Sequence, residues 1–125
     1  MKIEQLISPL DNRYNDKIAD LATNFSESNL NKVRFEIEIE WLIFPCSKGG
    51  KNFPALSKAN IKNLQALKNS FNEKSAKKVK SIEGKTNHDV KAVEYFIRDE
   101  LKKSSSLKRY EHSSFCIDQR RCEFT

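Results

Sequence analysis

The stretch LNKVRFEIEIEWLIF, residues 30–44, decides the fold class of this chain. Through its middle, apolar and polar residues alternate, which is the period of a β-strand. Glu36, Glu38 and Glu40 are nevertheless poor strand residues. A helix collects one apolar stripe about four turns long, with further apolar residues beside it. We therefore predict a helix, whose stripe comprises Leu30, Val33, Ile37, Trp41 and Phe44, flanked by Phe35, Ile39 and Leu42.

The composition also favours a small helical fold. The chain has 125 residues, 38% hydrophobic and 32% charged, so one domain with a thin apolar supply is expected. Three Gly and three Pro are too few for the frequent turns of a β-sandwich or barrel. No apolar run approaches the ~18 residues of a membrane span, and the N-terminus lacks the apolar segment of a secretory signal. Three scattered Cys argue against a disulfide framework, so we predict an all-α, cytoplasmic chain.

Capping residues and apolar spacing locate the first elements. Residues 1–14 are predicted to be extended and to close in a turn, in which Asp11–Asn12 tolerate left-handed geometry. A short helix is predicted from Asp16 to about Phe25. Either Ser26 or Ser28 then provides an N-cap for the long helix.

The second half of the chain is predicted to contain three more helices. Pro45–Pro54 contains two adjacent glycines and is predicted to be a loop. Ser57 caps the first of the three helices and Ser75 the second, in which Gly84 marks the end. The third helix is expected to end at Ser104–Ser106.

The charge of the chain suggests either solvation or an anionic ligand. The net charge is +6, and most of the basic residues are Lys, which on exposed helix faces are usually solvated. A nucleic-acid surface favours clustered Arg with interleaved aromatic residues, and the densest basic cluster contains no aromatic residue. We therefore do not expect nucleic-acid binding. That cluster comprises Lys74, Lys77, Lys78, Lys80 and Lys85.

Two short segments are candidates for ligand binding. Thr86–Asp89 opens the last helix, and the unpaired N–H groups of a helix N-terminus suit a phosphate or carboxylate. From spacing alone we favour simple capping by Asn87 or Asp89, with an exposed His88. The pair Arg13–Tyr14 offers a guanidinium that can fork onto a phosphate, although from the pair alone we favour a surface arginine beside a packed tyrosine.

Four strings in the chain carry a family resemblance. They are SPLDNRY at residues 8–14, FSE at 25–27, EIEIEWL at 36–42 and TNHDVKAVEYF at 86–96. In composition, order and separation they resemble the N-terminal region of bacterial adenylosuccinate lyases, over about residues 6–111. The last string is the most specific, because the related fumarases and aspartases do not share it whole. Where the family usually has Gly, this chain has Asn12, which also tolerates a positive φ.

The resemblance implies a fold and an activity. Residues 1–111 are expected to form the small helical N-terminal domain of the fumarase/aspartase-type lyase fold, with the central helical bundle missing. The family eliminates fumarate from adenylosuccinate and from succinyl-aminoimidazole-carboxamide ribotide in purine biosynthesis, without metal or organic cofactor. Its members are homotetramers whose active sites combine several subunits. The family's acid and base, a histidine and a serine on a mobile loop, lie further along a full-length chain, so we expect this chain alone to be inactive.

The resemblance also implies roles for five residues. Arg13 and Tyr14 bind the nucleotide end of the substrate, chiefly its phosphate. Asn87, His88 and Asp89 lie beside the same ligand, and His88 forms a hydrogen bond rather than acting as the principal acid. Apolar stripes on the long helices are expected to need cover from the missing bundle and from neighbouring subunits.

The last residues depart from the family pattern. After Glu111 the family continues with a string like FIHFALTSEDVNS, whose Thr-Ser pair binds substrate, whereas residues 112–125 read HSSFCIDQRRCEFT. Codons can be chosen from Ser114 onward that, shifted by one nucleotide, translate as HFALTSEDVNS. We therefore expect a frameshift near residues 111–114, real or from sequencing, and a disordered tail beyond it.

The cysteines offer a weaker alternative for the tail. His112, Cys116 and Cys122 provide three possible zinc ligands, but no second CxxC pair accompanies them, so we expect no metal site. Cys46 is predicted to be a small buried residue.

A different class of function stays open at this point. The chain can instead be a stand-alone basic helical module that binds RNA or a protein partner. Binding that falls steeply with salt and ignores changes at Arg13 and His88 would favour that module.

Overall fold

A computed structural model describes residues 7–47 and 55–111 of the chain. Every regular element in these two ranges is a helix, so the predicted all-α fold is confirmed. The chain divides at residue 30 into two compact units, which are described separately below.

The described part of the first unit, from residue 7, contains a short 3-10 helix, η2 (Pro9–Asp11). The Ser8 Oγ accepts a hydrogen bond from the Leu10 N–H at 3.2 Å, and Pro9 occupies the first helical position. Serine at the cap followed by proline is a typical helix start, because the missing proline N–H would be unpaired there anyway. The prediction of an extended segment is therefore wrong at residues 9–11.

The α-helix predicted from Asp16 begins later in the structure. A second 3-10 helix, η3 (Asn15–Lys17), precedes α1 (Ala19–Phe25), so the α-helix starts three residues after Asp16. Asn12 has a φ of −139°, so its tolerance of left-handed geometry is not used.

The long helix α2 (Glu27–Ser47) confirms the helical interpretation of its alternating sequence. The Ser26 Oγ accepts a hydrogen bond from the Asn29 N–H at 3.2 Å, which makes Ser26, not Ser28, the capping side chain. The helix continues past Pro45, where a loop was predicted. Its last turn is held because Cys46 is buried and its carbonyl accepts a hydrogen bond from the Leu56 N–H at 3.3 Å. The rest of the predicted loop, 48–54, lies outside the described residues.

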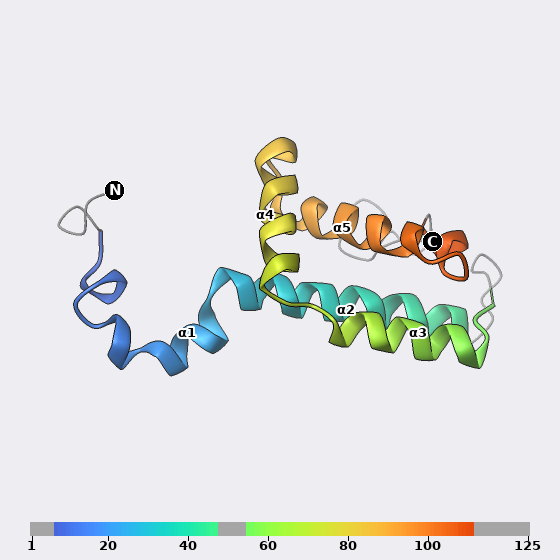
Figure 1. The fold of residues 1–125 in the computed structure, drawn as a ribbon, viewed down its shortest axis with the longest axis horizontal. Helices are drawn as coiled ribbons and strands as arrows, with labels where there is room; N and C mark the ends of the chain where they lie inside the picture. Colours follow the sequence, from blue (N-terminus) through green and yellow to red (C-terminus); the bar gives the residue numbers. More distant parts are fainter. Residues whose placement is uncertain (1–6, 48–54, 112–125) are drawn as a thin grey trace, which may run out of the picture. The chain divides into compact units, whose positions relative to one another are not determined.

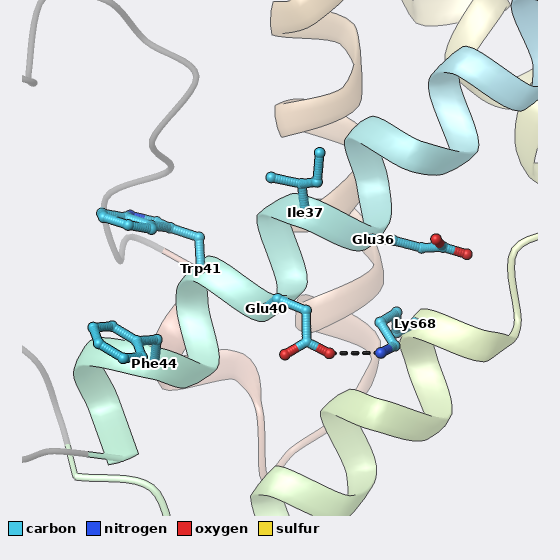
Figure 2. Close-up of a pocket in the computed structure, with 6 residues that line it drawn as sticks. All are labelled: Glu36, Ile37, Glu40, Trp41, Phe44 and Lys68. Atoms are coloured by element: carbon cyan, nitrogen blue, oxygen red, sulfur yellow. Dashed lines mark hydrogen bonds and ion pairs between the residues drawn. The ribbon is translucent and has the colours of Figure 1, made fainter.

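Two faces of α2 are apolar, and only one of them is buried. Ile39 is 0% exposed and belongs to the core, whereas Phe44 is 55% exposed. Figure 2 shows Ile37, Trp41 and Phe44 on this second face. The stripe expected to need cover is therefore exposed in this chain. The buried face comprises Phe35, Ile39, Leu42 and Cys46, and the exposed stripe Leu30, Val33, Ile37, Trp41 and Phe44.

In the described part of the second unit, α2 is followed by three further α-helices: α3 (Lys58–Asn69), α4 (Glu73–Thr86) and α5 (Asp89–Lys103). Figure 1 shows α4 running at a steep angle to the other long helices. Ser57 caps α3 as predicted, through a 3.2 Å hydrogen bond from the Asn60 N–H. The 3-10 helix η4 (Lys108–Tyr110) follows α5, which ends at Ser104 as expected.

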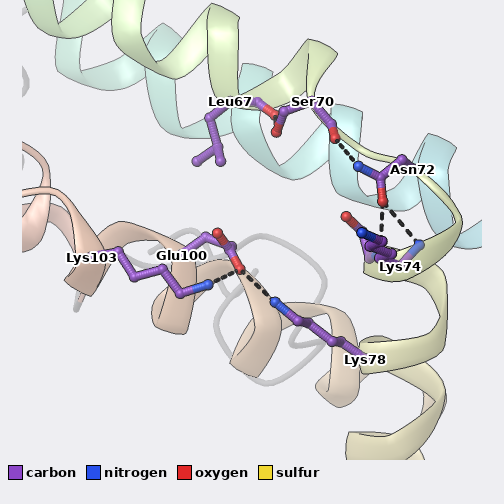
Figure 3. Close-up of polar contacts among 8 residues, drawn as sticks. Leu67, Ser70, Asn72, Lys74, Lys78, Glu100 and Lys103 are labelled. Carbon is purple, nitrogen blue, oxygen red and sulfur yellow. Dashed lines mark hydrogen bonds and ion pairs between the residues drawn. The ribbon is translucent and has the colours of Figure 1, made fainter.

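The start and end of α4 differ from the prediction. Asn72, not Ser75, is the cap: its Oδ1 accepts hydrogen bonds from the N–H groups of Lys74 at 2.9 Å and Ser75 at 3.2 Å (Figure 3). Asn72, three residues upstream of Ser75, caps the helix because its side-chain carbonyl oxygen accepts hydrogen bonds from two otherwise unpaired N–H groups. Gly84 lies inside the helix, which continues to Thr86. A single glycine weakens a helix without ending it.

Aromatic side chains from three segments form the centre of the core. The rings of Phe35, Phe71 and Phe96 have centroids 5.2 to 6.1 Å apart, in tilted and edge-to-face arrangements that aromatic pairs prefer. On α5, six of its fifteen residues are buried, which makes it the main core helix. At the other end of α5, Glu100 forms ion pairs with Lys103 and, at 3.9 Å, with Lys78 of α4 (Figure 3).

Candidate functional site

The turn between α4 and α5 has a backbone conformation that few residues adopt. Asn87 has φ 50° and ψ 32°, the left-handed conformation, and its N–H donates to the Glu83 carbonyl at 2.8 Å. It therefore ends α4, where we had predicted a cap for the next helix. Asparagine tolerates this conformation better than other non-glycine residues, and its exposed side chain stays available.

His88 is the residue that caps α5. Its Nδ1 accepts a hydrogen bond from the Lys91 N–H at 3.2 Å, and the Thr86 hydroxyl donates to its carbonyl at 3.2 Å. An imidazole nitrogen that accepts a hydrogen bond carries no proton, so the ring proton lies on Nε2. The side chain is 62% exposed, which leaves this Nε2–H donor accessible to a ligand.

Asp89 begins α5 and links it to α2. Its Oδ2 accepts a hydrogen bond from the Arg34 Nη1 at 2.8 Å, in an ion pair. Hydrogen bonds from the Val90 N–H and then from Arg34 hold the pKa of the Asp89 carboxyl below its ordinary value. The carboxylate is therefore ionised at neutral pH and fixed by two donors. It shapes the turn rather than offering a free base.

Arg13 and Tyr14 lie in the first unit. Both are exposed, and the Arg13 guanidinium carbon is 5.5 Å from the centroid of the Tyr14 ring. This distance is typical of a cation–π contact, which keeps a guanidinium available for a further anionic partner. The prediction of a packed tyrosine is therefore wrong, because Tyr14 is half-exposed and its ring contacts the Arg13 guanidinium.

Of the five predicted binding residues, the structure brings three together at one turn. Asn87, His88 and Asp89 present an amide, an imidazole and a carboxylate within one short connection between two helices. Arg13 and Tyr14 form a second group. The first group can donate hydrogen bonds to an anionic or polar ligand, and the second can bind a phosphate.

A second surface feature lies over α2 and α3. An open depression of about 620 Å³ is lined by apolar side chains from the exposed stripe of α2 and by one ion pair. Glu40 and Lys68 form that pair at 2.5 Å (Figure 2). Because it carries no convergent polar donors apart from this pair, the depression is typical of a packing surface rather than of a small-molecule site. Its lining residues are Glu36, Ile37, Glu40, Trp41, Phe44 and Lys68.

The other candidate groups are explained by solvation or burial. The five Lys of the α4 cluster are all exposed, as predicted, and two of them pair with Glu residues: Lys80 with Glu83 and Lys78 with Glu100. Cys46 is buried as predicted, and burial raises the pKa of its thiol, against an opposing effect of Arg109. No group of three metal-ligating side chains occurs within 7–47 or 55–111.

The predicted alternative zinc ligands His112, Cys116 and Cys122 lie outside the described residues. Among the residues that are described, none of the helices combines the length and the apolar character needed to cross a bilayer.

Comparison with known proteins identifies the relatives of the chain. An adenylosuccinate lyase from Escherichia coli strain K12 is 43% identical over 96 residues, which cover 76% of this chain. This chain is homologous to adenylosuccinate lyase. Adenylosuccinate lyases from Legionella pneumophila strain Corby and from Haemophilus influenzae are 41% and 40% identical, and the matches cover 82% and 81% of the chain. No protein-family model matches it.

The chain spans about a fifth of the length of these adenylosuccinate lyases: 21%, 23% and 22% of the three relatives. That share is consistent with the N-terminal region of the lyase, which the four strings had indicated. The resemblance seen in the sequence is therefore confirmed, and the alternative of a stand-alone RNA-binding or partner-binding module has no support.

Three residues have positioning roles at the turn that were not predicted from the sequence of this lyase homologue, although Thr86 and Lys91 lie in the string at residues 86–96. Thr86, Lys91 and Arg34 position His88 or Asp89 through the hydrogen bonds given above. Thr86 and Lys91 lie within three residues of His88, so a capping pattern could have indicated them. Arg34 is 55 positions from Asp89, and no local pattern in the sequence connects the two.

Proposed function

We propose that this chain supplies part of the substrate-binding site of an adenylosuccinate lyase. The full-length enzyme eliminates fumarate from adenylosuccinate and from succinyl-aminoimidazole-carboxamide ribotide, in purine biosynthesis in the cytoplasm. The observation that carries the proposal is the 43% identity to such a lyase, together with an exposed His88 donor at the specific string of residues 86–96. The ligand is a purine nucleotide, and no metal or organic cofactor is needed.

The resemblance to adenylosuccinate lyases assigns the five binding residues, and their chemistry fits the roles that it implies. The Arg13 guanidinium pairs with the nucleotide phosphate, and Tyr14 orients it by stacking. The Nε2–H of His88 and the amide of Asn87 donate to oxygen atoms of a nucleotide ligand. Asp89 stays ionised and holds the turn through Arg34.

The chain alone lacks the groups for proton transfer. Elimination of fumarate needs a base for the carbon-bound proton and an acid for the leaving nitrogen. We propose that both groups come from the part of a full-length lyase that this chain does not match, which is about four fifths of the relative's length. The expected result for this chain is ligand binding without fumarate release.

The exposed stripe of α2 supports assembly into a larger enzyme. Five large apolar residues on one helix face, with Trp41 and Phe44 beside an open depression, form a patch of the kind that marks an interaction surface. We propose that it is covered in a homotetramer, by the helical bundle of a full-length lyase or by neighbouring subunits. Residues 1–111 then form the N-terminal domain, and 112–125 an out-of-frame tail.

Binding of adenylosuccinate and AMP to the full chain tests the proposed site. We expect Arg13→Ala and His88→Ala to weaken binding about tenfold or more each, the factor for a lost hydrogen bond to a charged group. Asn87→Gly keeps the left-handed backbone and removes only the amide, so it should weaken binding without unfolding the turn.

Two variants serve as matched controls for this binding experiment. Lys17→Ala removes an exposed cation near Arg13 in sequence, and His112→Ala removes the other histidine of the chain. Both should bind like the wild type. Equal affinity of the wild type, Arg13→Ala and His88→Ala would contradict the proposed site, as would the absence of any nucleotide binding.

A further inference from the structure

The ion pair of Arg34 and Asp89 lies next to the histidine of the proposed site. Asp89 has one carboxylate oxygen 2.8 Å from the Arg34 Nη1 and the other 3.9 Å from the His88 Nδ1. The second distance is too long for a hydrogen bond. The carboxylate thus lies between a guanidinium that binds it and an imidazole nitrogen that it does not reach.

The His88 Nδ1 has two mutually exclusive partners. In the structure it accepts a hydrogen bond from the Lys91 N–H at 3.2 Å, which requires that Nδ1 carry no proton. If Nδ1 carried the proton, it could instead donate to the nearby carboxylate of Asp89. That alternative removes the cap of α5 and leaves Nε2 as an acceptor, which repels the oxygen atoms of an anionic ligand.

The position of Arg34 allows it to favour one of these two positions of the His88 ring proton. Arg34 precedes Phe35 in α2, and Phe35 is 1% exposed, so the backbone of α2 is anchored in the core at this position. The Arg34 side chain is itself 24% exposed, less than half the exposure of Asp89 at 50%. The Val90 N–H also holds the Asp89 carboxylate, and Arg34 supplies the donor from another helix.

We propose that Arg34 is a positioning residue of the α4–α5 turn: it holds the Asp89 carboxylate away from His88, so that Nδ1 caps α5 and Nε2–H faces an anionic group of the ligand. The ligand part of this inference rests on the proposed function. The part about the proton position concerns the chain alone and is measurable without any ligand.

Nuclear magnetic resonance of the full ¹⁵N-labelled chain tests the proton position. The ring nitrogen shifts of His88, at a pH at which the ring is neutral, show which nitrogen carries the proton, and amide exchange at Lys91 reports the cap. Arg34→Gln should move the proton toward Nδ1 and speed Lys91 exchange about fivefold, the factor for a lost helix cap. Arg34→Lys keeps a cation and should restore most of the wild-type behaviour.

Two further variants separate this role from a general loss of packing. Lys68→Gln breaks a different ion pair of α2, the one between Glu40 and Lys68 of α3, and should leave the His88 signals unchanged. Adding Asp89→Ala to Arg34→Gln removes the competing acceptor and should return the proton to Nε2. Unchanged His88 and Lys91 signals in Arg34→Gln, or the same change in Lys68→Gln, would overturn the proposal.

The affinity for AMP tests the link to ligand binding. Arg34→Gln should bind AMP severalfold more weakly than the wild type, and Arg34→Lys nearly as well as the wild type. Unchanged AMP affinity in Arg34→Gln with a displaced ring proton would overturn that link while the proposed function stands. If the wild type itself binds no AMP, the proposed function fails, and the measurement of the proton position is unaffected.

Discussion

The Tyr110 hydroxyl donates a hydrogen bond to the Ala55 carbonyl at 2.9 Å, across 55 positions of sequence. Tyr110 is fully buried, and the Arg109 guanidinium donates both to its oxygen at 2.8 Å and to the same carbonyl at 2.7 Å. This small network fastens η4 to the segment that precedes α3. It closes the second unit at the end opposite to the α4–α5 turn (Figure 1).

Tyr110→Phe should therefore destabilise the chain by about 1 kcal/mol, the usual net value of one buried hydrogen bond. The ring still fills its site, and Arg109 still satisfies the Ala55 carbonyl, so the loss stays small. Urea unfolding measures it. Tyr95→Phe, at a half-exposed tyrosine of α5, is the matched control and should change stability by less than about 0.5 kcal/mol. A larger loss in Tyr95→Phe than in Tyr110→Phe would contradict the role of the network.

Gly84→Ala should stabilise the chain by about 0.5–1 kcal/mol. The residue lies within α4, and a Cβ atom there would meet nothing within 4 Å, so only the conformational entropy of the unfolded chain changes. Thermal and urea unfolding check the sign. Ser81→Ala on the same helix controls for the gain in helix propensity and should stabilise less. A destabilised Gly84→Ala would show that the glycine serves a purpose other than helix formation.

The ion pair at Asp89 predicts a dependence of stability on pH. Because the pKa of the Asp89 carboxyl is lowered in the folded chain, the stability that it contributes is present above the ordinary value of 3.8 and is lost as the pH falls through the lower folded value. Wild type should therefore be more stable than Asp89→Asn at pH 6, and the difference should shrink below pH 3.8. Urea unfolding at both pH values measures it, and a difference that grows on acidification would contradict this sign.

The helices and the family were predictable from the sequence, because both depend on short local patterns of residues. Ser57 before an apolar period and the string at residues 86–96 are such patterns, and both were interpreted correctly. The cap of α4 was misplaced because Asn72 and Ser75 are both capping residues, and only the backbone path shows which one reaches the free N–H groups.

The candidate site was predictable only in part. The sequence indicated Asn87, His88 and Asp89, but the cap of α5 was predicted at Asn87 or Asp89. In the structure Asn87 adopts the left-handed conformation that ends α4, and His88 caps α5. Arg34 could not be found, because its contact with Asp89 depends on how α2 and α5 pack. Similarly, both faces of α2 are apolar in sequence, and packing alone decides that Phe35 and Ile39 are the buried ones.

Sequencing of the DNA from codon 100 onward tests the origin of the tail. We expect a one-nucleotide shift near residues 111–114 that joins this frame to HFALTSED and to a downstream histidine and serine of the lyase type. The basis for this expectation is the string HSSFCIDQRRCEFT at residues 112–125, which departs from the one that the family has after Glu111, whereas the match to a lyase covers 82% of the chain. A confirmed frame, with no such coding sequence after it, would contradict the frameshift.

A chimaeric enzyme tests the central claim most directly. Residues 1–111 of this chain would replace the corresponding region of the Escherichia coli adenylosuccinate lyase, to which it is 43% identical over 96 residues. We predict that the folded chimaera releases fumarate from adenylosuccinate and that His88→Ala within it lowers kcat/KM by about tenfold or more, whereas Lys17→Ala does not. A folded chimaera that binds no adenylosuccinate, or one indifferent to His88→Ala, would contradict the account.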